Sequence, residues 1–205
     1  MIRPSKIVCV GRNYLEHAKE LGNEVPKEPL IFLKPPSSLI DDGQPIRLTP
    51  MSKQVEYEGE IGVIVGKTLT RADENAARAA IQAIVAVNDV TARDLQKSDS
   101  QWTRAKGFDT FCPVGTPKAA PKDLSSLEVV TRVNGAERQR GKASQMAFSI
   151  PTVLSYISQI MTLEPGDLVC TGTPAGVGTL QPGDVVEVEV VGVSRVRNPV
   201  VAPTT

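Results

Sequence analysis

The sequence lacks the features that mark membrane, nucleic-acid-binding and exported proteins. Its 23 Lys and Arg residues balance 23 Asp and Glu residues, so no basic surface is predicted to attract nucleic acid or an anionic bilayer. The longest apolar stretches, such as Ile61–Val65, fall far short of the ~20 residues that a membrane-spanning helix requires. The first residues form neither a signal peptide nor an Arg-rich transit segment. We therefore expect a soluble cytoplasmic protein that binds neither nucleic acid nor membranes.

Cysteine and aromatic residues are also scarce. The three cysteines, Cys9, Cys112 and Cys170, are far apart and odd in number, which argues against a disulfide framework or a thiolate zinc site. Cys9 and Cys170 lie in apolar runs and are predicted to be buried, whereas Cys112 is predicted to be more accessible and is a remote candidate nucleophile. Neither Gly-x-Ser-x-Gly nor Gly-x-Gly-x-x-Gly occurs, so the usual signatures of α/β-hydrolases and dinucleotide folds are missing.

The 205 residues are enough for one domain with a continuous apolar core, and their pattern predicts mainly β-structure. Short helices are predicted over Tyr14–Leu21, over the Ala-rich segment Asp73–Ile84 and after a capping Ser149. The tail Arg197–Thr205 is predicted to fray. The expected strands, which combine alternation with β-branched residues, are Lys6–Gly11, Leu30–Lys34, Glu56–Val65, Ile84–Val90, Leu127–Val133, Asp167–Thr171 and Val185–Val191.

An acidic segment leads into one of the most apolar runs of the chain. If Glu56, Glu58 and Glu60 lie in one strand, alternation places all three carboxylates on the same face. Burying like charges together is costly unless a proton or a cation neutralises them, so a divalent metal site is one interpretation. A solvated face of an edge strand is the other, and this segment by itself favours neither.

Asp89 favours the metal interpretation. It follows the apolar run Ala83–Asn88, where a strand would deliver its carboxylate into a cleft as a third oxygen ligand. Asp89 is also a candidate cap of the helix predicted to start at Thr91, a role compatible with that of a ligand. Arg93, four residues after Asp89, is predicted to pair with it. Ligands that are all oxygen atoms favour Mg²⁺ or Mn²⁺ over Zn²⁺, and a single histidine cannot form a typical catalytic zinc set.

The one histidine has a carboxylate within reach. His17 and Glu20 are three residues apart, so a helix places them on one face, where Glu20 would orient the imidazole as a general base for water. A solvated surface pair is the alternative. Gly and Pro residues near the dyad make residues 14–28 a candidate lid that closes over a substrate.

Two further segments carry candidate ligand-binding groups. The loop Thr171–Gly178 follows an apolar strand and offers hydroxyl groups and backbone amides that would bind a carboxylate, unless it is a plain glycine turn. Lys106 is a candidate cation for a substrate oxygen, unless it is an ordinary exposed lysine.

Taken in order, six motifs of the chain resemble those of the fumarylacetoacetate hydrolase family. They are Val10–Tyr14, Phe32–Pro35, Tyr57–Glu60, Asn88–Asp94, Lys106–Asp109 and Thr171–Gly178. The resemblance covers nearly the whole chain and is to the short branch without an additional N-terminal domain. It implies an α+β, mainly β fold, a mixed β-sandwich roll with a few short helices, and a homodimer.

The same resemblance implies roles for individual residues, with Glu56 outside the metal set. A Mg²⁺ or Mn²⁺ ion would be held by Glu58, Glu60 and Asp89. The catalytic groups would be His17, Glu20 and Lys106. The residues that bind or support the substrate would be Arg12, Arg93, Gln96 and Thr173.

As an activity, the resemblance implies metal-dependent cleavage of a carbon–carbon bond in 2,4-diketo acids, such as acylpyruvates and fumarylpyruvate, or decarboxylation of oxaloacetate. Both reactions would pass through a pyruvate enolate stabilised by the cation and by Lys106. In the hydrolytic reaction, His17 would activate the water that attacks C4. Two alternatives stay open: an isomerase of unsaturated 2-keto diacids, and a non-catalytic module that binds a small ligand.

Overall fold

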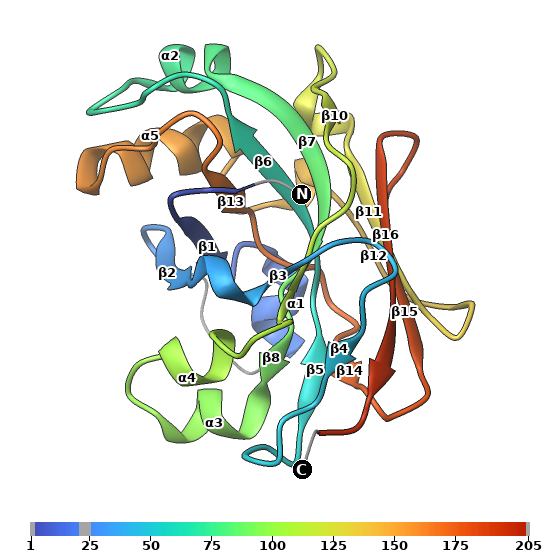
Figure 1. Ribbon diagram of the computed structural model, residues 1–205. Coiled ribbons are helices and arrows are strands. Elements are labelled where there is room, and N and C mark those ends of the chain that lie inside the picture. Colours follow the sequence, from blue (N-terminus) through green and yellow to red (C-terminus); the bar gives the residue numbers. More distant parts are fainter. Residues whose placement is uncertain (1–2, 21–25, 204–205) are drawn as a thin grey trace.

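Two facing β-sheets form the body of the protein, with short helices at their margins (Figure 1). The computed structural model describes residues 3–20 and 26–203. The larger sheet has the spatial order β10 (Lys118–Ala119), β7 (Ile81–Asn88), β6 (Gly59–Val65), β13 (Leu168–Cys170), β1 (Ile7–Gly11) and β2 (Leu30–Lys34). The second has the order β12 (Ala136–Lys142), β11 (Glu128–Val133), β15 (Val185–Val190), β16 (Ser194–Val201) and β4 (Ile46–Arg47). Both contain parallel and antiparallel pairs, so the predicted mixed, mainly β fold is confirmed.

Two small sheets and several short helices complete the described structure. The small sheets are β14 (Gly178–Thr179) with β5 (Val55–Tyr57) and β8 (Thr91–Ala92), and β3 (Leu39–Ile40) with β9 (Cys112–Pro113). The α-helices are α1 (Leu15–Glu20), α2 (Glu74–Ala79), α3 (Arg93–Ser98), α4 (Thr103–Lys106) and α5 (Ile150–Ile160). Single 3-10 turns cover Pro36–Ser38, Leu124–Ser126 and Ala143–Gln145. Within the described ranges, no helix is both long and apolar enough to cross a membrane.

The main core lies between the two sheets. Val63 of β6 and Ile84 of β7 belong to the same buried cluster as Val129 of β11 and Val188 of β15, and Leu154 of α5 extends it. A second buried cluster covers the opposite face of the larger sheet. Because β6 is buried on both faces, its sequence from Ile61 to Val65 is a continuous apolar run and does not alternate.

The helix predicted over Asp73–Ile84 is shorter than expected. It ends at Ala79, and β7 begins at Ile81. Pairing of β7 along the whole of β6 decides this boundary, because a ladder with a buried central strand outweighs the helix propensity of a few alanines. The predicted cap of α5 is present, since the Ser149 hydroxyl accepts a hydrogen bond from the Thr152 amide at 3.2 Å.

Two further boundaries differ from the prediction. The strand predicted over Glu56–Val65 is interrupted at Glu58: β5 pairs with β8 and β14, whereas β6 pairs with β7 in the larger sheet. The predicted fraying of Arg197–Thr205 is wrong up to Val201, because β16 extends to this residue and pairs with β15 and β4.

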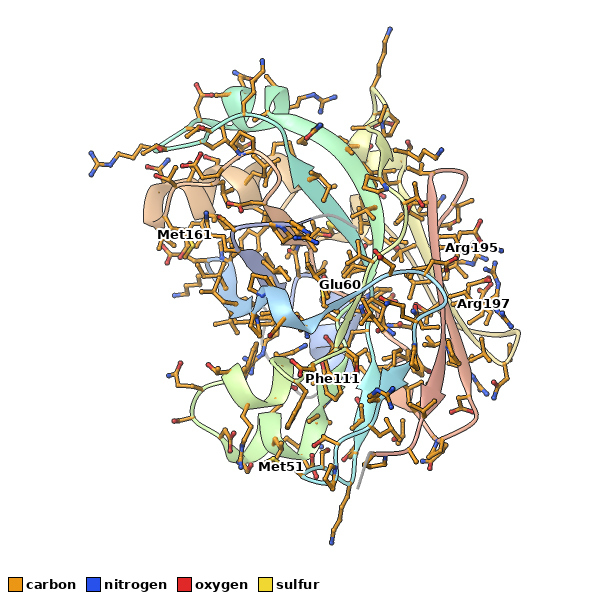
Figure 2. The ribbon with its side chains drawn as sticks, in the orientation of Figure 1. Met51, Glu60, Phe111, Met161, Arg195 and Arg197 are labelled. Carbon is orange, nitrogen blue, oxygen red and sulfur yellow. The ribbon has the colours of Figure 1, made fainter. Side chains whose placement is uncertain are left out.

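Both β12 and β16 are absent from the predicted strands, because β12 contains no β-branched residue and Asn198 and Pro199 interrupt the pattern of β16. Exposed and buried residues alternate along β16, and Arg195 and Arg197 project from its outer face (Figure 2). In the same view Glu60 lies in the interior of the molecule, where it is 1 % exposed.

The three cysteines come together in one buried cluster. Cys9 of β1 pairs in register with Cys170 of β13, and Cys112 of β9 packs against them. All three are fully buried, so the predicted accessibility of Cys112 is wrong: β9 pairs with β3 over the sheet. Burial raises the pKa of Cys9 to about 11, which keeps this thiol protonated and unreactive.

Candidate metal centre

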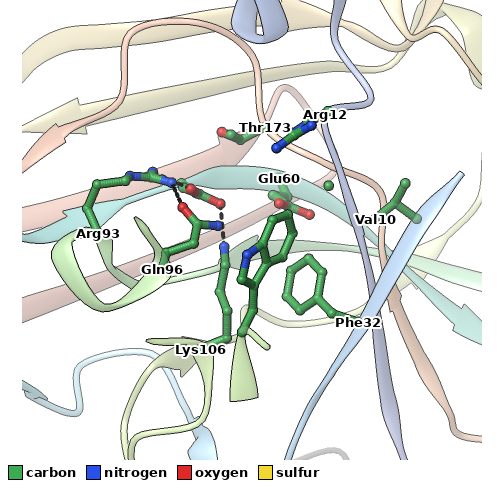
Figure 3. Close-up of a pocket in the computed structure, with 11 residues that line it drawn as sticks. Val10, Arg12, Phe32, Glu60, Arg93, Gln96, Lys106 and Thr173 are labelled. Carbon is green, nitrogen blue, oxygen red and sulfur yellow. Dashed lines mark hydrogen bonds and ion pairs between the residues drawn. The ribbon is translucent and has the colours of Figure 1, made fainter. Parts of the chain in front are cut away.

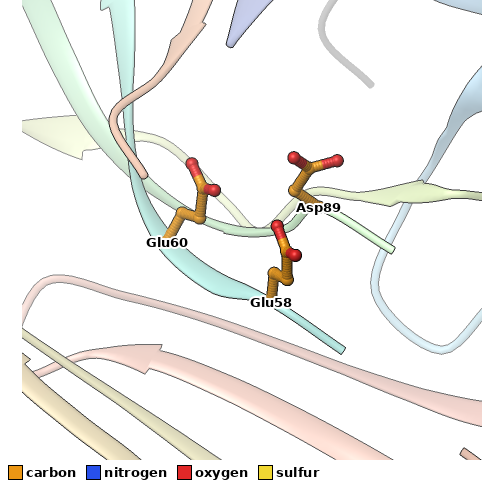
Figure 4. Close-up of side chains that lie close together, drawn as sticks. All are labelled: Glu58, Glu60 and Asp89. Carbon is orange, nitrogen blue, oxygen red and sulfur yellow. The ribbon is translucent and has the colours of Figure 1, made fainter. Parts of the chain in front are cut away.

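Three carboxylates from two neighbouring strands converge in the interior and form what we call the acidic trio: Glu58, Glu60 and Asp89. Glu58 precedes β6, Glu60 lies within it, and Asp89 follows β7. Antiparallel pairing sets Gly59 opposite Asn88, and the Asp89 amide donates to the Glu58 carbonyl at 2.8 Å. Each acid offers one oxygen, and these oxygens lie within 4.8 Å of one another (Figure 4). The structure therefore brings together the residues predicted to hold a metal.

Two lysines are buried against the acidic trio. The Lys106 ammonium lies 2.8 Å from a Glu58 oxygen and 2.7 Å from an Asp89 oxygen. Lys34, the last residue of β2, lies 2.6 Å from the other Asp89 oxygen. Burial alone would lower the pKa of Lys106, but the charges of Asp89 and Glu58 outweigh burial and raise it. The interpretation of Lys106 as an ordinary exposed lysine is therefore wrong, since this residue is 1 % exposed.

Arg93, the first residue of α3, binds acids other than the predicted one. Its Nε donates to Glu56 at 2.7 Å, and its other nitrogens donate to Glu58 and to Gln96. The predicted pair with Asp89 is wrong, because α3 starts at Arg93 and Asp89 neither belongs to this helix nor caps it. Glu56 is thus a buried partner of Arg93 outside the acidic trio, and the solvated-face interpretation is wrong for it.

The charges of this cluster balance only when Glu60 is protonated or a cation is bound. Four buried acids (Glu56 and the acidic trio) face three buried bases (Lys34, Arg93 and Lys106), which leaves one negative charge. The pKa of Glu60 is raised well above its ordinary value, mainly by burial and next by the negative charges of Asp89 and Glu58. Carboxylate oxygens suit Mg²⁺ and Mn²⁺, and an oxygen that accepts from a lysine keeps a second lone pair. The acidic trio therefore fits a hard divalent cation.

The metal-free protein is expected to lose stability, and to bind cations more tightly, as the pH rises. Because the pKa of Glu60 is raised on folding, its contribution to stability is fully present below the ordinary value of 4.5 and is lost as the pH rises through the raised pKa. A bound cation displaces this proton, so the apparent affinity should rise by up to about tenfold per pH unit in that range. Thermal unfolding in EDTA and in Mn²⁺, from about pH 5 to pH 8, checks this. A gain in Tm from Mn²⁺ that does not grow with pH would contradict it.

A cavity beside the acidic trio has one charged wall and one aromatic wall (Figure 3). The Phe32 and Trp102 rings meet edge to face with their centroids 5.2 Å apart, and the Lys106 ammonium lies 4.9 Å from the Phe32 centroid. All four residues predicted to bind or support the substrate line this cavity. The lining residues are Val10, Gly11, Arg12, Phe32, Glu58, Glu60, Arg93, Gln96, Trp102, Lys106 and Thr173.

Amides of the loop Thr171–Gly178 already bind carboxylates of the protein. Gly172 donates to Glu60 at 2.8 Å, and Gly176 donates to Glu20 at 3.0 Å. Both glycines have a positive φ, 98° and 101°, which a residue with a side chain adopts only with strain. The loop is therefore more than a plain turn: it supports acids of the site itself.

The candidate dyad is described only in part. His17 lies in α1, but its side chain is outside the described part of the structure, as are residues 21–25 of the predicted lid. Glu20, at the end of α1, ties this helix to the loop through the Gly176 amide. The dyad as a general base, and its alternative as a solvated pair, both stay predictions.

Two buried polar residues of the site are missing from the sequence-based prediction. Lys34 ends the apolar strand Leu30–Lys34, and a charge at such a position is itself a signal of a buried counterion. Gln139 binds Gly59 and Thr173 from the second sheet. No local pattern marks it, because β12 is mostly exposed.

Known proteins resemble the chain over nearly its whole length. The family described as Fumarylacetoacetate (FAA) hydrolase C-terminal matches residues 6–201. The mitochondrial oxaloacetate decarboxylase of Dictyostelium discoideum is 45% identical over 194 residues, which cover 91% of this chain and 89% of that protein. The mitochondrial oxaloacetate tautomerase FAHD1 of Arabidopsis thaliana is 44% identical over 199 residues, with coverages of 94% and 89%. The crystal structure of fumarylpyruvate hydrolase from Pseudomonas aeruginosa in complex with Mn²⁺ and pyruvate has a TM-score of 0.91 at 28% identity, covering 98% of this chain and 91% of that one.

Proposed function

Since the chain belongs to the fumarylacetoacetate hydrolase family, we propose that it is an enzyme that converts a short 2-keto acid through its enolate, with oxaloacetate as the first candidate substrate. The observation that carries this proposal is the convergence of the acidic trio among buried bases, beside a cavity. Two relatives named for oxaloacetate chemistry, at 45% and 44% identity, support the substrate class.

The charge of the cluster supports an anionic substrate. A divalent cation would convert its single negative charge into a single positive one, and Arg12 adds a further positive charge at the cavity wall. Oxaloacetate carries two carboxylates, so its charge would neutralise the filled cavity. This match matters because buried charges are tolerated only when they are paired.

The side chains of the cavity supply orientation and electrostatic stabilisation. A bound divalent cation would supply the positive charge that stabilises the developing enolate. Lys106 holds a fixed ammonium at the cavity wall, where it stabilises negative charge on a substrate oxygen. Arg93 keeps Glu58 in place through its ion pair. Phe32 and Trp102 form an apolar wall that excludes water and so strengthens these interactions.

Three reactions pass through an enolate with its oxygen at C2, which is the enolate of oxaloacetate in tautomerisation and the enolate of pyruvate in the two cleavage reactions. Tautomerisation of oxaloacetate moves a proton between C3 and the C2 oxygen, and decarboxylation breaks the C3–C4 bond, both without attack by water. Hydrolysis of a 2,4-diketo acid also breaks the C3–C4 bond, but it requires water activated by a base. The presence of His17 and Glu20 in one short helix favours this hydrolysis as a second candidate function.

A substrate panel tests the proposal. Purified protein is given oxaloacetate, acetylpyruvate or fumarylpyruvate, with Mg²⁺, with Mn²⁺ or with EDTA, against protein-free controls. Coupling to lactate dehydrogenase detects release of pyruvate, and ultraviolet absorbance follows the enol of oxaloacetate, which separates cleavage from isomerisation. We expect cation-dependent conversion of oxaloacetate. Absence of cation-dependent turnover across the panel would contradict the proposal and favour a non-catalytic binding module.

His17→Ala is expected to impair hydrolysis of acetylpyruvate by about 10²–10⁴-fold, the contribution typical of a general base. Decarboxylation of oxaloacetate should change much less, because no water attacks in that reaction. Glu16→Ala, an exposed neighbour in α1, is the control and should leave both rates unchanged. Equal losses of both activities in His17→Ala would count against His17 as the base that activates water.

A further inference from the structure

Gln139 closes a ring of hydrogen bonds around Gly59, the residue between two members of the acidic trio. The Gly59 amide donates to Gln139 Oε1 at 3.0 Å, and Gln139 Nε2 donates to Thr173 Oγ1 at 2.7 Å. Thr173 Oγ1 in turn donates to the Gly59 carbonyl at 2.9 Å. Both backbone polar groups of Gly59 are thereby held by side chains from outside its own strand.

The partners of Gln139 determine how its amide is oriented. Nε2 also donates to the Pro174 carbonyl at 2.8 Å, so both N–H groups of the side chain are used. A backbone N–H only donates and a backbone carbonyl only accepts, so the oxygen must face Gly59 and the nitrogen must face Pro174. Gln139 is 2 % exposed. Any other arrangement would leave a buried polar group unsatisfied, so the ring specifies a single geometry.

Gln139 reaches this ring from the second sheet. It lies in β12 opposite Thr131 of β11, whereas Gly59 begins β6 of the larger sheet. Gly59 has no room for a side chain, because a Cβ there would lie 1.9 Å from the Thr131 hydroxyl. Gly59 thus packs against Thr131 of the second sheet and is hydrogen-bonded to Gln139. The directions of the Glu58 and Glu60 side chains depend on the position of Gly59, because it lies between them in the chain.

We propose that Gln139 is a positioning residue that couples Glu58 and Glu60 to the cavity loop carrying Thr173. The proposal rests on the proposed function, because it concerns the same site. In the described structure Gln139 is not among the residues that line the cavity, so it acts through Gly59 and Thr173. Opening the ring lets both acids and the loop shift together, which weakens binding of a cation and of an anion next to it.

Gln139→Met tests this proposal, because Met is similar in size to Gln and forms none of these hydrogen bonds. We expect the Kd for Mn²⁺ alone, measured by calorimetric titration, to rise about 10–100-fold, as is typical when a group that orients metal ligands is lost. The Kd for oxalate, a planar mimic of the pyruvate enolate, should rise as well at saturating Mn²⁺. Gln159→Met is the matched control: it makes the same exchange in α5, where Gln159 Nε2 donates to the Ala72 carbonyl at 3.1 Å, outside the ring. Its Mn²⁺ Kd should stay within about twofold of wild type.

A double-mutant cycle with Thr173→Val separates positioning from a general effect on stability. If Gln139 acts through Thr173, the Mn²⁺ Kd of the double variant should be close to that of Gln139→Met or Thr173→Val, whichever of the two binds Mn²⁺ less tightly. If Gln139→Met does not fold, Thr173→Val opens the same ring and should raise the Mn²⁺ Kd by itself. A lower Tm with an unchanged Mn²⁺ Kd, or strictly additive effects, would overturn the proposal.

Mn²⁺ binding by the wild-type protein distinguishes failure of this inference from failure of the proposed function. A wild type that binds Mn²⁺ but converts no keto acid contradicts the function, while the Gln139 variants still decide the positioning role. A wild type that does not bind Mn²⁺ overturns the inference together with the cation centre.

Discussion

Glu60→Gln is expected to weaken Mn²⁺ binding by more than about a hundredfold and, in the same protein, to stabilise the metal-free form. The substitution removes a charged ligand oxygen, whose loss should exceed the effect of losing a group that only orients ligands. It also removes the charge of an acid whose pKa is raised by burial and by Asp89 and Glu58. The Gly172 amide keeps an oxygen to bind, so the loop should stay in place. Turnover of oxaloacetate should fall with the loss of the cation.

Calorimetric titration with Mn²⁺ checks the weaker binding, and thermal unfolding in EDTA checks the greater stability of the metal-free form. At about pH 8 the Tm of Glu60→Gln should exceed that of wild type by several degrees, and the difference should shrink as the pH falls toward 4.5. Glu189→Gln, in a surface ion pair with Arg132, controls for the loss of a carboxylate and should leave Mn²⁺ affinity unchanged. Wild-type Mn²⁺ affinity in Glu60→Gln would rule out the acidic trio as the cation site.

Lys106→Met is expected to keep Mn²⁺ binding but to lose stability and substrate binding. Without the lysine, Glu58 and Asp89 lose their shared counterion, which should cost the metal-free protein about 3–5 kcal/mol in the free energy of unfolding. The cluster also becomes more negative, so a divalent cation is attracted at least as strongly. Loss of the ammonium at the cavity wall should lower kcat/KM by about 10²–10³-fold.

Lys34→Met is the matched comparison, because Lys34 binds the same Asp89 but is not among the described residues that line the cavity. Both variants should unfold at lower temperature in EDTA, and Mn²⁺ should restore much of that loss. Weaker oxalate binding by the Mn²⁺-loaded protein is expected for Lys106→Met and not for Lys34→Met. An oxalate Kd equal to that of wild type in Lys106→Met would show that Lys106 does not act on the substrate.

Much of the β-structure could be predicted from local patterns, and Leu30–Lys34 forms a strand with the predicted bounds. The acidic segment shows where such patterns fail. If Val55–Val65 were one continuous strand, Glu56, Glu58 and Glu60 would share a face. In the structure the strand is interrupted at Glu58, so Glu56 belongs to β5 in another sheet and binds Arg93. Which sheet a strand joins depends on distant partners, so the break could not be predicted from neighbouring residues.

By itself, the sequence determined which residues could bring charge into the interior and which segments could form strands, because alternation and β-branching act over a few neighbouring positions. The tertiary structure alone decided which acid meets which base. Lys34 and Asp89 are 55 positions apart, and Gly59 and Gln139 are 80 apart, so these pairs form only when apolar burial brings their strands together. The free energy of such a pair depends on its geometry and on the removal of water, and both arise only when the whole core closes.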